Sequence, residues 1–178
     1  MILQKEFYFV RHGQTDHNIS DGNLKKDHPE DIPLNETGKA QAKIIAPAIT
    51  SLPIRTVCAS PLKRVQQTKE IITHHLQAEH HEIHDLGECT AQIWKEMVRL
   101  GMYSSLPKEG LARQFMDRVL NGINHALSLP SPSLIVAHGG VHWALCCLMG
   151  IEKHEWAIGN CIPVHFLFES KWIAKKLA

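Results

Sequence analysis

The chain has 178 residues, of which 44% are hydrophobic and 21% charged. This supplies enough apolar side chains for one sizeable core, so we predict a single domain over residues 1–178. The composition excludes a disordered, collagen-like or coiled-coil chain. Nineteen Lys and Arg against 18 Asp and Glu give a formal net charge of +1, so no global field attracts nucleic acid or an anionic membrane. Any anion site must be built locally.

The cysteines argue against a disulfide framework and against a thiolate zinc site, because they are odd in number and show no Cys-x-x-Cys spacing. We therefore expect reduced thiols in a cytoplasmic protein. Lys5 and Glu6 interrupt the apolar start, so no secretory signal is expected. Residues 134–151 carry no Asp, Glu, Lys or Arg, but Gly139 and Gly140 break the run, which favours a strand, a turn and a buried helix over a membrane span.

Short β-branched or aromatic runs alternate with helical patterns along the chain. In chain order we predict a strand at 7–10, a helix at 36–51, strand 56–59, helix 62–76, strand 82–86, helix 110–127, strand 134–137, helix 141–149 and strand 164–168. Such alternation is typical of a parallel sheet with crossover helices. We therefore predict an α/β fold, a three-layer sandwich with a mostly parallel central sheet and helices on both faces.

Several local signals refine these elements. Asn35 is a suitable N-cap for the first helix, and Pro47 is expected to kink or end it. Residues 20–34 are rich in Pro, Asp and Asn and are predicted to form a long loop of a kind that is usually functional or mobile. Lys171, Lys175 and Lys176 are expected in a frayed, solvated tail.

Charged side chains gather where the predicted strands end. The first strand is followed by Arg11-His12-Gly13, and the second by Ser60-Pro61, with Arg64 in the opening turn of the next helix. The third is expected to end near Glu88, and the fourth is followed by His138-Gly139-Gly140. Because open parallel sheets bind ligands beyond the carboxyl ends of their strands, we expect these side chains to share one crevice.

This set of residue types fits a phosphoryl group. A guanidinium presents a planar fork of donors that matches phosphate oxygens, and a helix N-terminus adds backbone N–H groups. A neutral histidine beside such a clamp can attack phosphorus, and neighbouring arginines favour the neutral form. A carboxylic acid on the opposite side can protonate the leaving oxygen.

At these residues the chain resembles the histidine phosphatase superfamily, also called the phosphoglycerate mutase-like family. The matching segments occur in the family's order: FVRHGQTDHN at 9–18, LNETGKAQA at 34–42, ASPLKRVQQT at 59–68 and VAHGG at 136–140. The combination is specific, although Arg-His-Gly alone would be a weak signal.

The resemblance implies roles for individual residues. His12 would be the nucleophile that becomes phosphohistidine, and Arg11, Arg64 and His138 would clamp the phosphoryl group. Asn18 and the Gly139 backbone would be further donors to it. Glu88 would be the general acid for the leaving group and then the base that activates water. The positive side chains would take the place of a metal ion, so neither a metal nor another cofactor is expected.

The match is poorest around the acid. Family members often continue from the glutamate into Gly-x-Trp-Glu-Gly, but CTAQIWKE follows Glu88 here and keeps only the spacing of Trp94. This change leaves the shape of the segment beyond the acid undetermined. Asp85 and Glu96 are therefore alternative candidates for the acid, although Glu88 is preferred because it combines the family spacing with the expected strand end.

Histidine spacing also raises a metal site as an alternative. His138 and His142 could share a helical face, and three further histidines cluster at 80, 81 and 84. A zincin motif would need Glu directly after the first histidine, but Gly139 follows His138, so a functional metal site is the less favoured alternative.

Within the family, three functions remain open. A phosphatase passes the phosphoryl group to water, a mutase returns it to a second hydroxyl, and a non-catalytic module would only bind the phosphorylated ligand. About two dozen residues separate Glu88 from the helix at 110–127, too few for a water-excluding enclosure, which favours hydrolysis. The expected partner is a phosphorylated small molecule or phosphoprotein substrate, and the sequence does not indicate an oligomeric state.

Overall fold

The computed structural model describes residues 1–19, 31–101, 106–151 and 158–177. Most of the segment predicted as a long loop, 20–34, therefore lies outside the described residues. The elements are β1 (Phe7–Arg11), α1 (Asp16–Ile19), α2 (Glu36–Thr50), β2 (Thr56–Ala59), α3 (Lys63–Ile72), β3 (Glu79–Glu82), the 3₁₀ helix η1 (His84–Leu86), α4 (Ala91–Leu100), α5 (Leu111–Ser128), β4 (Ser133–Ala137), α6 (Gly139–Met149), β5 (Pro163–Phe168) and β6 (Trp172–Lys176).

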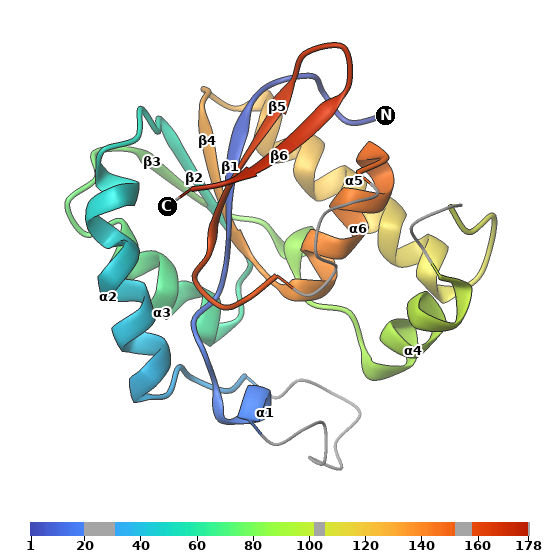
Figure 1. Cartoon of the computed structure of the whole chain (residues 1–178), viewed down its shortest axis with the longest axis horizontal. Helices are drawn as coiled ribbons and strands as arrows, with labels where there is room; N and C mark the ends of the chain where they lie inside the picture. The colour runs from blue at the N-terminus through green and yellow to red at the C-terminus, as the bar shows by residue number, and fades with distance from the viewer. Residues whose placement is uncertain (20–30, 102–105, 152–157, 178) are drawn as a thin grey trace.

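The strands form one six-stranded mixed sheet in the order β3-β2-β4-β1-β5-β6. Strands β1 to β4 pair in parallel, and β5 and β6 are added antiparallel beside β1. In Figure 1 the sheet stands between α2 and α3 on one side and α5 and α6 on the other. The α/β sandwich with a mostly parallel sheet and helices on both faces is confirmed.

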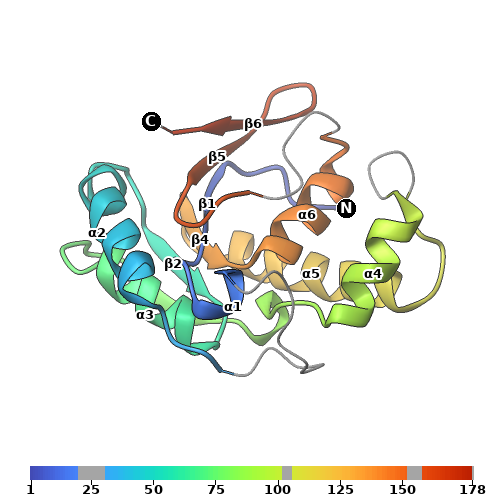
Figure 2. The same cartoon turned by 60° about the horizontal axis from the view of Figure 1, so that its bottom comes forward.

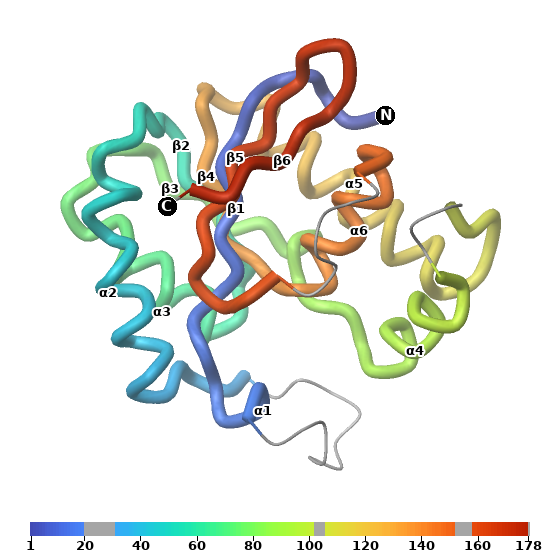
Figure 3. The backbone as a smooth tube through the Cα atoms, viewed as in Figure 1, coloured from blue at the N-terminus to red at the C-terminus, as the bar shows by residue number. Residues whose placement is uncertain are grey.

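The two faces of the sheet carry separate hydrophobic cores, which follow from the alternation of side chains along each strand. Phe7 and Phe9 of β1 point into the core beneath α5 and α6, and Tyr8 and Val10 point into the core beneath α2 and α3. Figure 2 shows the two helical layers separated by the sheet. The larger core also takes the buried face of α4, centred on Met97, and the tube in Figure 3 shows α4 beside α5.

Side-chain caps and helix lengths mostly follow the sequence. The Asn35 side chain accepts a hydrogen bond from the Gly38 N–H at 2.8 Å, so the predicted N-cap of α2 is confirmed. Pro47 lies inside α2, which ends three residues later at Thr50. Helix α3 stops at Ile72, four residues before the predicted end, and α6 begins two residues earlier than predicted, at Gly139.

One strand prediction and the prediction for the C-terminal lysines were wrong. The third strand is Glu79–Glu82 and not 82–86. Backbone pairing with β2 determines the position of this polar edge strand, and residues 84–86 form η1. The C-terminal lysines are not in a frayed tail: Lys175 and Lys176 belong to β6, which pairs with β5. Helices α1 and α4 and strand β6 were not predicted.

A close backbone contact fixes the loop that follows β1. A Cβ atom on Gly38 would lie 2.1 Å from the Gln14 carbonyl oxygen, and one on Gly13 would lie 2.5 Å from that of Gly38. The Gly13 N–H also donates to Thr68 Oγ1 of α3 at 3.0 Å. The loop after β1 is therefore held by the N-terminus of α2 and by α3. The first contact requires glycine at positions 13 and 38, and the second requires the Thr68 hydroxyl.

Residues 134–151, which lack acidic and basic side chains apart from histidine, form most of β4 and all of α6. Across the described ranges, none of the helices has the length and apolar content that a membrane span requires.

Candidate active site

The His12 side chain lies at the end of β1 and is held at both ring nitrogens. Its Nδ1 is 2.7 Å from the Gly13 carbonyl oxygen, and its Nε2 is 3.3 Å from Arg64 Nε. The carbonyl can only accept and the guanidinium can only donate, so Nδ1 carries the proton and Nε2 presents its lone pair. The ring is 3% exposed, so this arrangement is almost wholly removed from water.

His138 lies at the end of β4 as the N-cap residue of α6, and its ring is linked to the same arginine. Arg64 Nη2 is 3.4 Å from His138 Nδ1, and His138 Nε2 is 2.8 Å from Ser60 Oγ. Since the arginine donates to Nδ1, the proton of a neutral ring is on Nε2 and is donated to the Ser60 hydroxyl. Arg64 therefore connects the two histidines, whose ring centroids are 5.3 Å apart.

Arg11 lies at the end of β1 and faces the first residue of α6. Its Nη1 donates to the Ile158 carbonyl oxygen at 2.7 Å, and its buried Nε has no hydrogen-bond partner among the described residues. A Cβ atom on Gly139 would be 3.4 Å from that Nε. A buried donor beside a helix N-terminus is suited to an anion.

Glu88 reaches the same helix N-terminus from the segment between η1 and α4. Its Oε1 accepts from the Gly140 N–H at 3.1 Å and from the Cys89 N–H at 2.9 Å, and Oε2 is 3.4 Å from the Gly140 nitrogen. A Cβ atom on Gly140 would lie 2.4 Å from Oε1, so glycine is required for this approach. The expectation that Glu88 lies directly at a strand end was wrong, because β3 ends at Glu82.

The two alternative carboxylates lie elsewhere. A Cβ atom on Gly122 of α5 would be 2.9 Å from Asp85 Cβ, which places Asp85 against that helix. Glu96 Oε1 would be 2.5 Å from a Cβ atom on Gly110, at the start of α5. Among these three candidates, Glu88 is the one whose carboxylate contacts the N-terminus of α6.

The Asn18 side chain is held by hydrogen bonds to Thr15 and Asn160. Its Oδ1 accepts from the Thr15 N–H at 3.0 Å and from Asn160 Nδ2 at 3.5 Å. Asn160 also donates to the His12 carbonyl oxygen at 2.8 Å. The structure therefore brings Arg11, His12, Arg64, Glu88, His138 and Gly139 to one edge of the sheet, with Asn18 tied to the backbone of His12 through Asn160.

The sequence analysis missed several supporting residues. Ser60 and Thr68 were noted only as parts of motifs, and nothing local marks Asn160 as a partner of His12. Arg118 was also missed, and its signal is a cation at the edge of the apolar stripe of α5, between Phe115 and Gly122.

The family model for the histidine phosphatase superfamily (branch 1) matches residues 7–170. The chain belongs to this superfamily. The family that the motifs at the strand ends suggested is therefore confirmed.

Two curated relatives illustrate the range of similar proteins. The chain is 30% identical over 178 residues to an agropine synthesis reductase of Rhizobium rhizogenes, a match that covers 91% of this chain and 39% of the relative. The chain thus spans about two fifths of that protein's length. It is 31% identical over 179 residues to the uncharacterized phosphatase PhoE of Bacillus subtilis (strain 168), covering 93% of this chain and 90% of PhoE.

Among solved structures, a mycobacterial glucosyl-3-phosphoglycerate phosphatase in complex with VO3 superposes with a TM-score of 0.70 at 19% identity, and the match covers 98% of each chain. This likeness establishes the shared fold of the histidine phosphatase superfamily.

Burial and the arginines favour the neutral form of both histidines in this member of the superfamily. Desolvation, followed by the charge of Arg64, lowers the pKa of His12 from 6.5 to about 3. Desolvation and the neighbouring His12 and Arg64 hold the pKa of His138 well below its ordinary value. Burial also lowers the pKa of Arg11 and of Arg64, and the Glu88 carboxylate partly offsets this. The positive charge of the site is therefore on the two arginines.

The described residues do not place three or more His, Cys, Asp or Glu side chains in a group that could hold a metal ion. His142, one of the histidines considered for such a site, packs in the core with its ring centroid 5.4 Å from that of Phe9.

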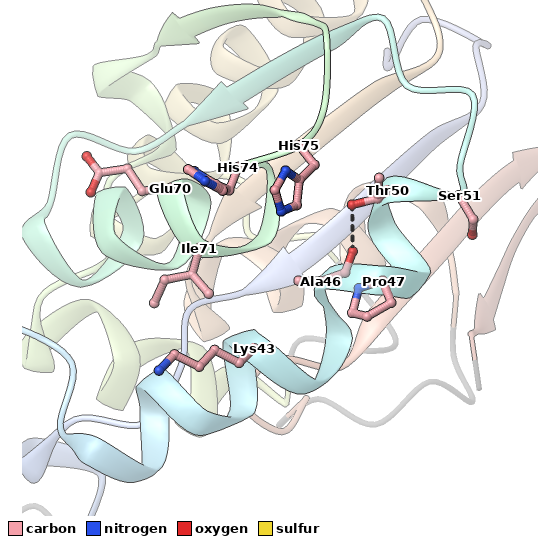
Figure 4. A pocket seen from close by; sticks show the side chains of 9 residues that line it. All are labelled: Lys43, Ala46, Pro47, Thr50, Ser51, Glu70, Ile71, His74 and His75. Carbon is pink, nitrogen blue, oxygen red and sulfur yellow. Dashed lines mark hydrogen bonds between the residues drawn. The ribbon is translucent and has the colours of Figure 1, made fainter.

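A cavity of about 840 Å³ lies at the other end of the helical pair that covers one face of the sheet. It is lined by the C-terminal half of α2 and the end of α3, including Lys43, Glu70, His74 and His75 (Figure 4). The residues of these two helices that lie near the His12 site, Gly38 and Arg64, are at the opposite, N-terminal ends. This cavity is therefore separate from the crevice around His12.

The low pKa of His12 predicts how stability depends on pH. Below about pH 6.5 this imidazole binds a proton in the unfolded chain, but in the folded chain it does so only near pH 3. The contribution of His12 to the free energy of unfolding is therefore fully present above pH 6.5 and falls as the pH decreases, by up to about 1.4 kcal/mol per pH unit. In His12→Asn, the free energy of unfolding should fall less steeply between pH 6.5 and pH 5, by up to about 1.4 kcal/mol per pH unit. Urea denaturation at several pH values measures this slope. Equal slopes in the two proteins would contradict the neutral, buried state of His12.

Proposed function

We propose that this chain is a metal-independent phosphomonoesterase that works through a phosphohistidine on His12, with Glu88 as general acid and base. The observation that carries the proposal is the unprotonated Nε2 of His12, which accepts from Arg64 in the crevice at the N-terminus of α6. The Arg11 Nε in this crevice has no hydrogen-bond partner among the described residues. A nucleophile is thus adjacent to groups that bind a phosphoryl dianion.

In the first half-reaction, His12 Nε2 attacks phosphorus and forms the N–P bond as the ester P–O bond breaks. Arg11, Arg64 and the Gly139 N–H stabilise the charge on the equatorial oxygens. His138 joins the clamp, since a bound dianion would raise the pKa of its ring. Glu88, in its acid form, gives its proton to the departing alcohol oxygen.

In the second half-reaction, water attacks phosphorus on the side that the alcohol has left. Glu88 takes a proton from that water as the N–P bond breaks, so inorganic phosphate leaves and neutral His12 and protonated Glu88 are regenerated. Glu88 Oε1 is tied to two backbone N–H groups, so the more distant Oε2 is the oxygen available for proton exchange. The scheme uses the arginines for charge stabilisation and requires no metal.

Hydrolysis is preferred over phosphoryl transfer back to a second hydroxyl. Between Glu88 and α5 the chain forms the ten-residue helix α4, whose apolar face is committed to the core through Met97. This segment is too short to enclose the site in the way that a mutase needs to exclude water. We propose a phosphorylated small molecule or a phosphorylated protein side chain as substrate, in keeping with the phosphatase names of PhoE and of the mycobacterial structure.

The phosphoenzyme is the direct test of this function. Rapid mixing with a ³²P-labelled aryl phosphate followed by quenching should give a phosphoprotein that is labile in acid and stable in base. The label should be absent in His12→Ala, because the attacking nitrogen is gone. A matched control is His75→Ala, which removes an exposed histidine in the turn after α3 and should label normally. Undiminished labelling of His12→Ala would refute the assignment, and no labelling of the wild-type chain by any phosphomonoester would favour a non-catalytic binding module.

The acid role of Glu88 predicts a dependence on the leaving group. Glu88→Gln should slow the hydrolysis of alkyl phosphates by about 10² to 10⁴, the usual contribution of general acid catalysis. Phosphorylation of His12 by an activated aryl phosphate should change much less, because that alcohol leaves without protonation. The phosphoenzyme should then accumulate, since the base for water attack is also removed. Glu96→Gln, in α4, is the matched control and should behave as wild type. Equal slowing with both substrates would assign Glu88 a structural role.

A further inference from the structure

Among the side chains gathered at the site, Glu88 alone is placed without the direct support of a strand end or a helix. His12 and His138 directly follow β1 and β4, and Arg64 is in the first turn of α3. Glu88 instead lies in an irregular segment beyond η1, so the register of the sheet does not determine where its carboxylate lies. Some other contact must fix this segment against α6.

The Arg118 guanidinium of α5 provides that contact. Its Nη2 donates to the carbonyl oxygens of Gly87 and Glu88 at 3.0 and 3.2 Å. Its Nη1 makes longer contacts with the carbonyl oxygens of Asp85 and His84, at 3.4 and 3.5 Å. One guanidinium thus spans the whole turn that leads to the acid, and the planar fork of arginine is what allows it to do so.

The helix that carries Arg118 is a rigid base. Residues on both sides of it, including Phe115, Val119 and Gly122, are buried in the larger core. The guanidinium carbon also lies 5.0 Å from the centroid of the Phe115 ring, an arrangement suited to a cation–π contact. Gly87 lacks the Cβ that would come within 3.0 Å of Arg118 Nη1, so the arginine can approach the turn closely.

Burying this cation costs solvation, and desolvation lowers the pKa of Arg118. The carbonyl oxygens of the turn compensate for that cost, so the charge and the turn hold each other in place. Glu88 is consequently fixed from two sides: by Arg118 at its backbone carbonyl and by the Gly140 N–H at its carboxylate.

We propose that Arg118 is a positioning residue that sets the place of the Glu88 carboxylate for proton transfer. This inference rests on the proposed function, because it requires Glu88 to be the acid. The hydrogen bonds of Arg118 go to the backbone carbonyl oxygens of this turn, and not to the side chains proposed to bind the phosphoryl group. Its removal should therefore affect the steps that use Glu88 and leave the attack by His12 intact.

The test compares Arg118→Met with wild type in two assays: alkyl phosphate turnover, and the rate of His12 phosphorylation by an activated aryl phosphate. Alkyl phosphate turnover should fall by about tenfold to a hundredfold, the cost of a small misplacement of a catalytic group. The aryl phosphorylation rate should stay within about threefold of wild type. Arg113→Met is the matched control, since Arg113 is on the same helix in an exposed ion pair with Asp117, and it should leave both rates unchanged.

A double-mutant cycle with Glu88→Gln separates positioning from general damage. In that background, Arg118→Met should change alkyl phosphate turnover by less than about twofold, because the proton donor it positions is already gone. Arg118→Lys keeps the charge but cannot bridge the two carbonyls, so it should show the same pattern in a milder form and serves if the Met variant does not fold.

Four results would overturn the proposal in distinguishable ways. Equal slowing of both substrates, or a full additional loss in the Glu88→Gln background, would refute the positioning role and leave the proposed function standing. Wild-type turnover of alkyl phosphates by Arg118→Met and Arg118→Lys would do the same. Failure of the wild-type chain to form any phosphoenzyme would refute the proposed function, and the role of Arg118 with it.

Discussion

The hydrogen bond from His12 Nδ1 to the Gly13 carbonyl oxygen is the constraint on which the site depends. It holds the proton on Nδ1 and leaves Nε2 unprotonated, so that Nε2 accepts from Arg64 Nε. The carbonyl can serve this purpose because its own residue is fixed: the Gly13 N–H is bound by Thr68, and a Cβ atom at Gly13 would collide with the Gly38 backbone. Thr68 also donates to the Arg64 carbonyl oxygen at 2.7 Å, so one hydroxyl links the two partners of His12.

Burial of the arginines explains why this arrangement suits an anion. Both Arg11 and Arg64 have pKa values lowered by desolvation, so each guanidinium is held in an environment that solvates it poorly. The Ile158 carbonyl and the Glu88 carboxylate offset part of the cost. A phosphoryl dianion would offset much more, because its oxygens can accept from both guanidinium groups and from the start of α6. In the proposed reaction, the binding energy is thus directed at the phosphoryl group.

The sequence predicts the parts of the site that follow buried strands. Residues 7–10, 56–59 and 134–137 are short apolar runs, and the ends of these runs place Arg11, His12 and His138 almost to the residue. The third strand was misplaced because Glu79–Glu82 is a polar edge strand, ordered by its pairing with β2 and not by a hydrophobic pattern. Contacts such as those of Asn160 with His12 and of Arg118 with Gly87 join residues distant in the chain. No local pattern marks Asn160, and the place of Arg118 beside the apolar stripe of α5 does not indicate which turn it contacts.

In the proposed mechanism, His12 reacts through Nε2 because Nδ1 is hydrogen-bonded to the Gly13 carbonyl oxygen. The most direct measurement is NMR of the ¹⁵N-histidine-labelled chain before and after phosphorylation by an activated aryl phosphate. We predict a neutral His12 ring with its proton on Nδ1 at neutral pH, and a phosphoryl group on Nε2 with ¹⁵N–³¹P coupling to that nitrogen. A proton on Nε2, a charged ring at neutral pH, or a phosphoryl group on Nδ1 would contradict this mechanism.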